Sequence, residues 1–133
     1  LPATRVTPAD AKGFAKWLSN STGRRYRLPT EAEWKHAATQ GGQDPLVEGY
    51  CKVTQGDKVL TTSPRQVNAG VMNGWGLVNT VGNVREIVDA GGGGFAAVGG
   101  SYQDEPSACD ADARRAVTGP DEATGFRLVR ELD

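Results

Sequence analysis

The chain has 133 residues, which is the size of one domain with a single hydrophobic core. Its formal net charge is −1, so it lacks the basic excess of proteins that bind nucleic acid or anionic membranes, and we expect no nucleic-acid partner. No apolar run approaches the length of a membrane span, so we expect no membrane insertion. The 18 glycines and 7 prolines predict many turns and little regular structure.

The first predicted helix begins after Thr7, whose hydroxyl is a good cap, with Pro8 at the first helical position. Apolar residues then recur at helical spacing, and residues 19–23 are expected to end the helix. Its expected buried face comprises Ala11, Phe14, Ala15 and Leu18.

A second predicted helix opens with a capping box, in which Thr30 and Glu33 satisfy each other's backbone amides. Its expected buried face comprises Trp34, Ala37 and Ala38. His36 lies on the same helix and has no second histidine with which to share a metal, so a solvated or hydrogen-bonded side chain is expected.

The remainder of the chain predicts short strands and long irregular loops. A hairpin is expected around residues 55–57, and strands at residues 95–98 and 126–129, while the glycines at 91–94 predict a turn. Trp75 is expected in the core. These elements predict an α+β fold with two helices, short strands and much irregular loop, organised as a single domain over residues 1–133.

Two cysteines, Cys51 and Cys109, allow three interpretations: one disulfide, two reduced thiols, or part of a metal site. A disulfide is typical of an extracytoplasmic compartment.

Four motifs occur in order, at residues 26–34, 79–86, 99–102 and 125–127. Together they resemble the formylglycine-generating enzyme, or sulfatase-modifying factor, family, which implies a variant of the C-type lectin fold. The resemblance runs from Val6 to Arg130 and matches the later part of the family domain. It leaves open whether the missing opening segment, or another chain, is a partner that completes the domain.

The resemblance implies a structural calcium site in the second motif. By position, the ligands are the side chain of Asn79, the carbonyls of Gly82 and Val84, and the carboxylate of Glu86. Such a mixed oxygen set suits a hard cation. The alternative is that Asn79 and Glu86 only hydrogen-bond loop amides.

The family's active site is a pair of cysteines, five residues apart, that bind copper(I) and use oxygen to convert a substrate cysteine to formylglycine. Cys109 stands at the first position, whereas Arg114 occupies the second. Arg85 and Ile87 replace family aromatic residues, so the resemblance implies a domain that has lost the oxidase chemistry. With Cys109 freed from that role, we predict a Cys51–Cys109 disulfide.

The predicted function is therefore a non-catalytic module that binds a protein or peptide, in a bacterial extracytoplasmic signalling or secretion-related protein, with the periplasm as the expected location. The residues expected to form its binding face are Arg85, Ser101, Tyr102, Arg114 and Arg127. Arg127 can instead be a buried arginine paired with a carboxylate. A separate acidic stretch is expected to form a solvated loop, with a carboxylate pair for acid–base work as the alternative. Its residues are Asp104, Glu105, Asp110, Asp112, Asp121 and Glu122. The rival functions are a divergent oxygen-dependent oxidase, with Cys109 as a reactive thiol, and a calcium-dependent carbohydrate binder.

Overall fold

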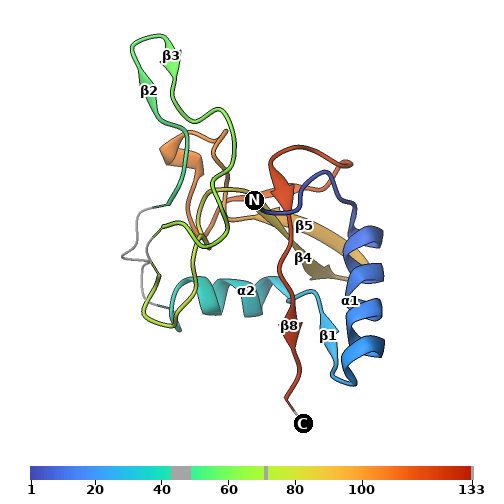
Figure 1. Ribbon diagram of the computed structural model, residues 1–133. Helices are drawn as coiled ribbons and strands as arrows, with labels where there is room; N and C mark the ends of the chain where they lie inside the picture. The colour runs from blue at the N-terminus through green and yellow to red at the C-terminus, as the bar shows by residue number, and fades with distance from the viewer. Residues whose placement is uncertain (43–48, 71, 133) are drawn as a thin grey trace.

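The computed structural model describes residues 1–42, 49–70 and 72–132, and Figure 1 shows their arrangement. The helices are α1 (Pro8–Thr22) and α2 (Glu31–Ala38), with one short 3-10 turn, η1 (Pro106–Ala108). The strands are β1 (Tyr26–Arg27), β2 (Thr54–Gln55), β3 (Lys58–Val59), β4 (Arg85–Gly91), β5 (Gly94–Val98), β6 (Arg114–Ala116), β7 (Thr124–Gly125) and β8 (Val129–Arg130). The α+β class, the two helices and the loop-rich second half are as predicted.

Both helices begin with a capping box, as predicted for α2, and the predicted cap Thr7 forms the one at α1. Thr7 Oγ1 accepts a hydrogen bond from the amide of Asp10 at 3.1 Å, and Asp10 Oδ2 accepts one from the amide of Thr7 at 2.9 Å. Thr30 and Glu33 make the equivalent pair at the start of α2, at 3.1 and 2.9 Å. These contacts are local, so the sequence alone was sufficient to predict both helix starts.

The central sheet has the order β6-β5-β4-β7, in which β4 pairs antiparallel with β5 and parallel with β7. Ile87 and Val88 are consecutive on β4 and therefore point to opposite faces. Val88 packs in one core cluster with Trp34 of α2, and Ile87 packs in a second cluster with Ala11 of α1. The sheet is thus covered by a helix on each face.

Two smaller antiparallel ribbons complete the fold. β2 and β3 form the predicted hairpin, with Gly56 at its turn. β1 pairs with β8, so a segment near the start of the chain lies beside one near its end (Figure 1). None of the described helices combines the length and the apolar character needed to cross a membrane.

Two aromatic residues depart from the expected burial. Trp75 is 52% exposed rather than part of the core, because it lies in a loop where it makes an edge contact with His36, with ring centroids 5.2 Å apart. Phe14 is 46% exposed, and of the residues of α1 only Ala11 and Ala15 are buried. Phe14 still contacts Phe126 edge-on, with ring centroids 5.9 Å apart.

Candidate functional site

The two cysteines form the predicted disulfide. Cys51 and Cys109 are 58 residues apart in sequence, and their Cα atoms are 6.1 Å apart. Gly100 lies against this bridge with φ of 70°, and a Cβ atom there would come within 2.8 Å of Cys109 Sγ. The glycine of the third motif therefore allows the backbone to approach the bridge closely. Neither cysteine is free.

Beside the disulfide, the first residue of β4 forms a buried ion pair. Arg85 donates to the carboxylate of Asp104 through Nε at 3.1 Å and Nη2 at 3.0 Å. Asp104 also accepts a hydrogen bond from Ser101 Oγ at 2.9 Å. Burial raises the pKa of Asp104, but the hydrogen bonds from Arg85 and Ser101 outweigh it and hold that pKa below its ordinary value. Asp104 is thus a fixed, ionised partner of Arg85 and not part of a solvated loop.

Arg85 forms part of the wall of a small cavity, which we call the basic pocket. Its volume is about 220 Å³. The residues that line it are Arg85, Ala97, Gly100, Asp104, Ala108, Ala113, Arg114 and Arg115. Three arginines and one aspartate give this lining an excess of positive charge.

Both arginines of β6 are exposed in this pocket. Arg114 Nε donates to Glu31 at the start of α2, at 2.7 Å. Arg115 approaches Asp104 only at 4.0 Å, and its side chain is 58% exposed. Arg115 is therefore the less tightly paired of the two.

Three of the five predicted binding residues are buried, which corrects the proposed face. Arg85 is 5% exposed, Tyr102 is 4% exposed and Ser101 is fully covered. The backbone carbonyl of Tyr102 accepts a hydrogen bond from Thr61 Oγ1 at 3.0 Å, which holds the segment around Tyr102 in the interior. Of the predicted face, only Arg114 keeps a largely exposed side chain.

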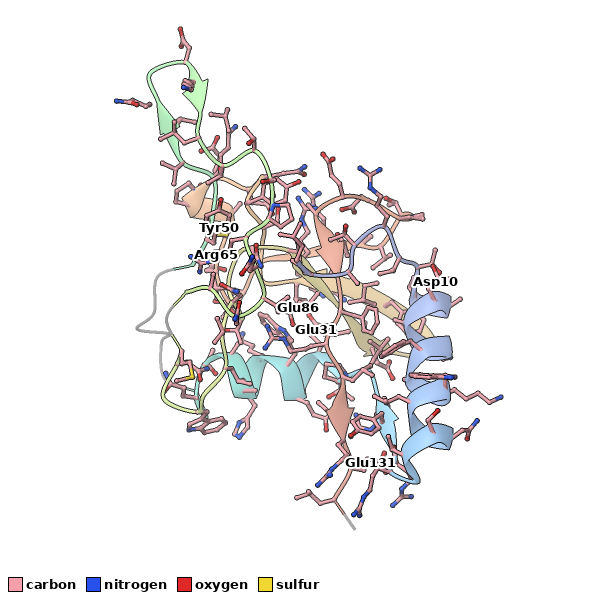
Figure 2. The ribbon with its side chains drawn as sticks, in the orientation of Figure 1. Asp10, Glu31, Tyr50, Arg65, Glu86 and Glu131 are labelled. Carbon is pink, nitrogen blue, oxygen red and sulfur yellow. A yellow bond between two sulfur atoms is a disulfide. The ribbon has the colours of Figure 1, made fainter. Side chains whose placement is uncertain are left out.

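Arg127 adopts the structural role that the sequence left open. Its Nε lies 2.6 Å from Glu86 Oε1, and its Nη2 lies 2.9 Å from Oε2. Trp34 Nε1 donates to the same Oε1 at 3.0 Å. Glu86 is 3% exposed, and burial raises its pKa while the ion pair with Arg127 opposes that rise. Figure 2 shows Glu86 in the interior, above α2.

The predicted calcium ligands are only partly brought together. Asn79, Val84 and Glu86 line one cavity of about 310 Å³, which Arg127 also lines. Asn79 Oδ1 already accepts hydrogen bonds from Nε and Nη2 of Arg65, at 3.0 and 2.6 Å. All three side-chain oxygens of the predicted set, Asn79 Oδ1 and the two carboxylate oxygens of Glu86, are therefore engaged by guanidinium groups, and this donor set does not fit a calcium ion.

The family model described as "Sulfatase-modifying factor enzyme 1-like domain" matches residues 1–132. The chain belongs to this family. Among its relatives, the formylglycine-generating enzyme of Streptomyces coelicolor is 33% identical over 175 aligned positions, which cover 99% of this chain and 53% of that protein. The enzyme of the same name from Thermomonospora curvata is 36% identical over 105 positions, covering 64% of this chain and 32% of the relative. The chain thus spans about half of the first relative and about a third of the second.

Solved structures agree with this membership. PvdO from Pseudomonas aeruginosa superposes with a TM-score of 0.77 at 22% identity, covering 98% of this chain and 62% of that one. CarF gives a TM-score of 0.75 at 26% identity, covering 98% and 67%. The variable protein 1 of Treponema denticola gives 0.77 at 21% identity, covering 96% and 70%. The sulfatase-modifying-factor fold predicted from the four motifs is confirmed.

Sequence reasoning missed two residues of the site region. Glu31 holds Arg114 across 83 residues of sequence, and Arg65 reaches Asn79 across 14. No motif contains Arg65, and its partners are set by how the loops fold over one another. A local signal for either contact was therefore absent.

Proposed function

We propose that this domain is a non-catalytic binding module that recognises a protein or peptide partner through the basic pocket. The observation that carries the proposal is the Cys51–Cys109 disulfide, which removes the thiol at the position of the family's first active-site cysteine. Arg114 stands at the second position. Copper(I) is bound by soft thiolate ligands, and a guanidinium has no lone pair to offer a metal.

The charge of the basic pocket favours a partner that carries a carboxylate. Arg115 has only a 4.0 Å contact with Asp104, so its planar fork is available to an incoming acid. Arg85 lies deeper, with its charge already balanced by Asp104. The volume of about 220 Å³ suits one side chain of a larger partner rather than a complete small molecule.

The disulfide also supports a location outside the cytoplasm, because thiol-reducing systems keep cysteines reduced in the cytoplasm. We propose that the domain belongs to a bacterial extracytoplasmic protein that serves signalling or secretion, with the periplasm as the compartment. The loop-rich surface around a helix-covered sheet is consistent with such a role, since variable loops on a rigid scaffold commonly form binding sites.

A pair of labelled peptides tests the binding function. One peptide carries a single glutamate in a neutral background, and its twin carries glutamine at the same position. We expect the acidic peptide to bind about tenfold more tightly, the range that a charge-assisted hydrogen bond supplies. Arg115→Glu is expected to abolish this preference, whereas Arg130→Glu, outside the pocket lining, is expected to keep it. Equal binding of the two peptides, or an unchanged preference in Arg115→Glu, would contradict the proposed pocket.

The alternative function is a divergent oxygen-dependent oxidase acting on cysteine or another side chain. The observation in its favour is that the curated relatives named above are formylglycine-generating enzymes. This function requires the thiol of Cys109, so it is tested on the reduced domain with copper(I) and a cysteine-containing peptide. We expect no oxygen uptake above that of a Cys109→Ser control. Uptake that depends on Cys109 would replace the binding module with the oxidase.

A further inference from the structure

The side chain of Arg65 contacts the second motif, although Arg65 itself belongs to none of the four motifs. Its guanidinium donates to Asn79 Oδ1 through two nitrogens, at 3.0 and 2.6 Å. An amide oxygen has two lone pairs, so Asn79 has none left for a metal ion. Figure 2 shows Arg65 beside Tyr50, next to the loops that carry this motif.

The backbone of Arg65 is fixed by the second asparagine of the motif. Asn83 Oδ1 accepts from the amide of Arg65 at 2.8 Å, and Asn83 Nδ2 donates to the carbonyl of Arg65 at 3.2 Å. Asn83 is 2% exposed, so these bonds form in the interior. The guanidinium carbon also lies over the ring of Tyr50, 4.7 Å from its centroid. The position of this charge is therefore set by several contacts at once.

The surrounding chain is shaped to admit this side chain. A Cβ atom at Gly70 would lie 2.5 Å from Arg65 Nη2, so only glycine fits there without displacing the guanidinium. Gly70 also has φ of 111°, in the region that favours glycine.

The charge balance opposes a divalent ion at the same place. Glu86 is the single carboxylate among the predicted ligands, and Arg127 already neutralises it. Oε1 of Glu86 accepts two hydrogen bonds, from Trp34 and Arg127, which fill that oxygen. A calcium ion on Asn79 would thus meet the positive charge of Arg65 without a free carboxylate to compensate.

We infer that the Arg65 guanidinium takes the place of a calcium ion in this domain and holds residues 79–83 in position without metal. The inference is independent of the binding function proposed above.

Thermal unfolding in excess EDTA and in millimolar calcium chloride tests it on the unaltered protein. A ligand that binds only the folded state raises the midpoint temperature, so we expect the same midpoint in both buffers. Isothermal titration with calcium chloride is expected to give no saturable heat. A higher midpoint in calcium, or a saturable site, would overturn the inference, and neither readout depends on making a variant.

Variants then test whether Arg65 itself does the work. Arg65→Gln is expected to lower the midpoint by about 4 °C or more in either buffer, because Asn79 and the ring of Tyr50 lose a charged partner. Arg130→Gln, an exposed arginine of β8, is the matched control and is expected to leave the midpoint unchanged. An Arg65→Gln midpoint equal to that of the control would show that the guanidinium does not hold residues 79–83 in position.

Discussion

The guanidinium of Arg127 forks onto the carboxylate of Glu86, with Nε 2.6 Å from Oε1 and Nη2 2.9 Å from Oε2. Arg127 also donates through Nη2 to the carbonyls of Val78 and Asn79, at 3.0 and 3.3 Å. One side chain therefore ties the end of the chain to both the sheet and the second motif.

Arg127→Met is expected to destabilise the domain by about 3 kcal/mol, because it leaves the buried Glu86 without its counter-charge. Urea unfolding measures the loss. The double variant Arg127→Met/Glu86→Gln is the control, and it is expected to lose less than the sum of the two single variants. Strict additivity would mean that the pair acts as two independent residues.

Removal of the disulfide is expected to cost about 4 kcal/mol, the loop-entropy value for a bridge that spans 58 residues. The measurement is chemical unfolding of Cys51→Ser/Cys109→Ser beside the oxidised parent. The single variant Cys51→Ser is expected to be about equally destabilised and to expose a thiol that alkylating reagents modify. A double variant as stable as the parent would show that the bridge adds nothing to stability.

Acid is expected to weaken the junction between β1 and α2. A side-chain hydrogen bond from Arg27, together with the backbone amide of Thr30, lowers the pKa of Glu33 from 4.5 to about 2. A carboxyl with a lowered folded-state pKa stabilises the fold above its unfolded pKa, and this contribution is lost as the pH falls from 4.5 towards 2. Glu33→Gln should flatten the dependence of the midpoint temperature on pH in that window. Titration of Glu33 in its ordinary range, followed by NMR, would contradict this prediction.

Alanine substitutions at two glycines with nearly equal φ angles distinguish a steric clash from backbone strain. Gly82 has φ of 80° and Gly76 has φ of 82°. A Cβ atom at Gly82 would lie 2.6 Å from the backbone nitrogen of Tyr50, whereas no atom lies within 4 Å of one at Gly76. We expect Gly76→Ala to cost about 1 kcal/mol of left-handed strain. Gly82→Ala is expected to cost clearly more, and equal losses in urea unfolding would argue against the close approach.

The features that the sequence predicted well are those decided by neighbouring residues or by a few fixed motifs. The capping box of Thr30 and Glu33 needs only three residues of separation, and the fold class follows from motifs whose order specifies the family. The strand predicted at residues 126–129 was wrong, because strands β7 and β8 lie on either side of residues 126–128. The burial of Tyr102 and the exposure of Trp75 depended instead on which loop lies over which. Loop packing is a long-range property, and no pattern within a single segment encodes it.

The candidate site shows the same division. The Cys51–Cys109 pairing was predictable because only two cysteines exist. The pairing of Arg85 with Asp104 was not, since any of several acidic residues in that loop had the same formal charge. Distance and burial selected the partner, and both come only from the folded chain.

The opposite orientations of Ile87 and Val88 limit how this domain can change in length. Glu86 precedes them on the same strand. One residue inserted ahead of β4 is therefore harmless only if the chain before Arg85 forms a bulge that accommodates it. An insertion inside the strand would reverse which face of the sheet each side chain points to. The apolar side chains and the Glu86 carboxylate would then both face the wrong helix. We therefore expect length variation to be confined to the loops, while β4 keeps an invariant residue count.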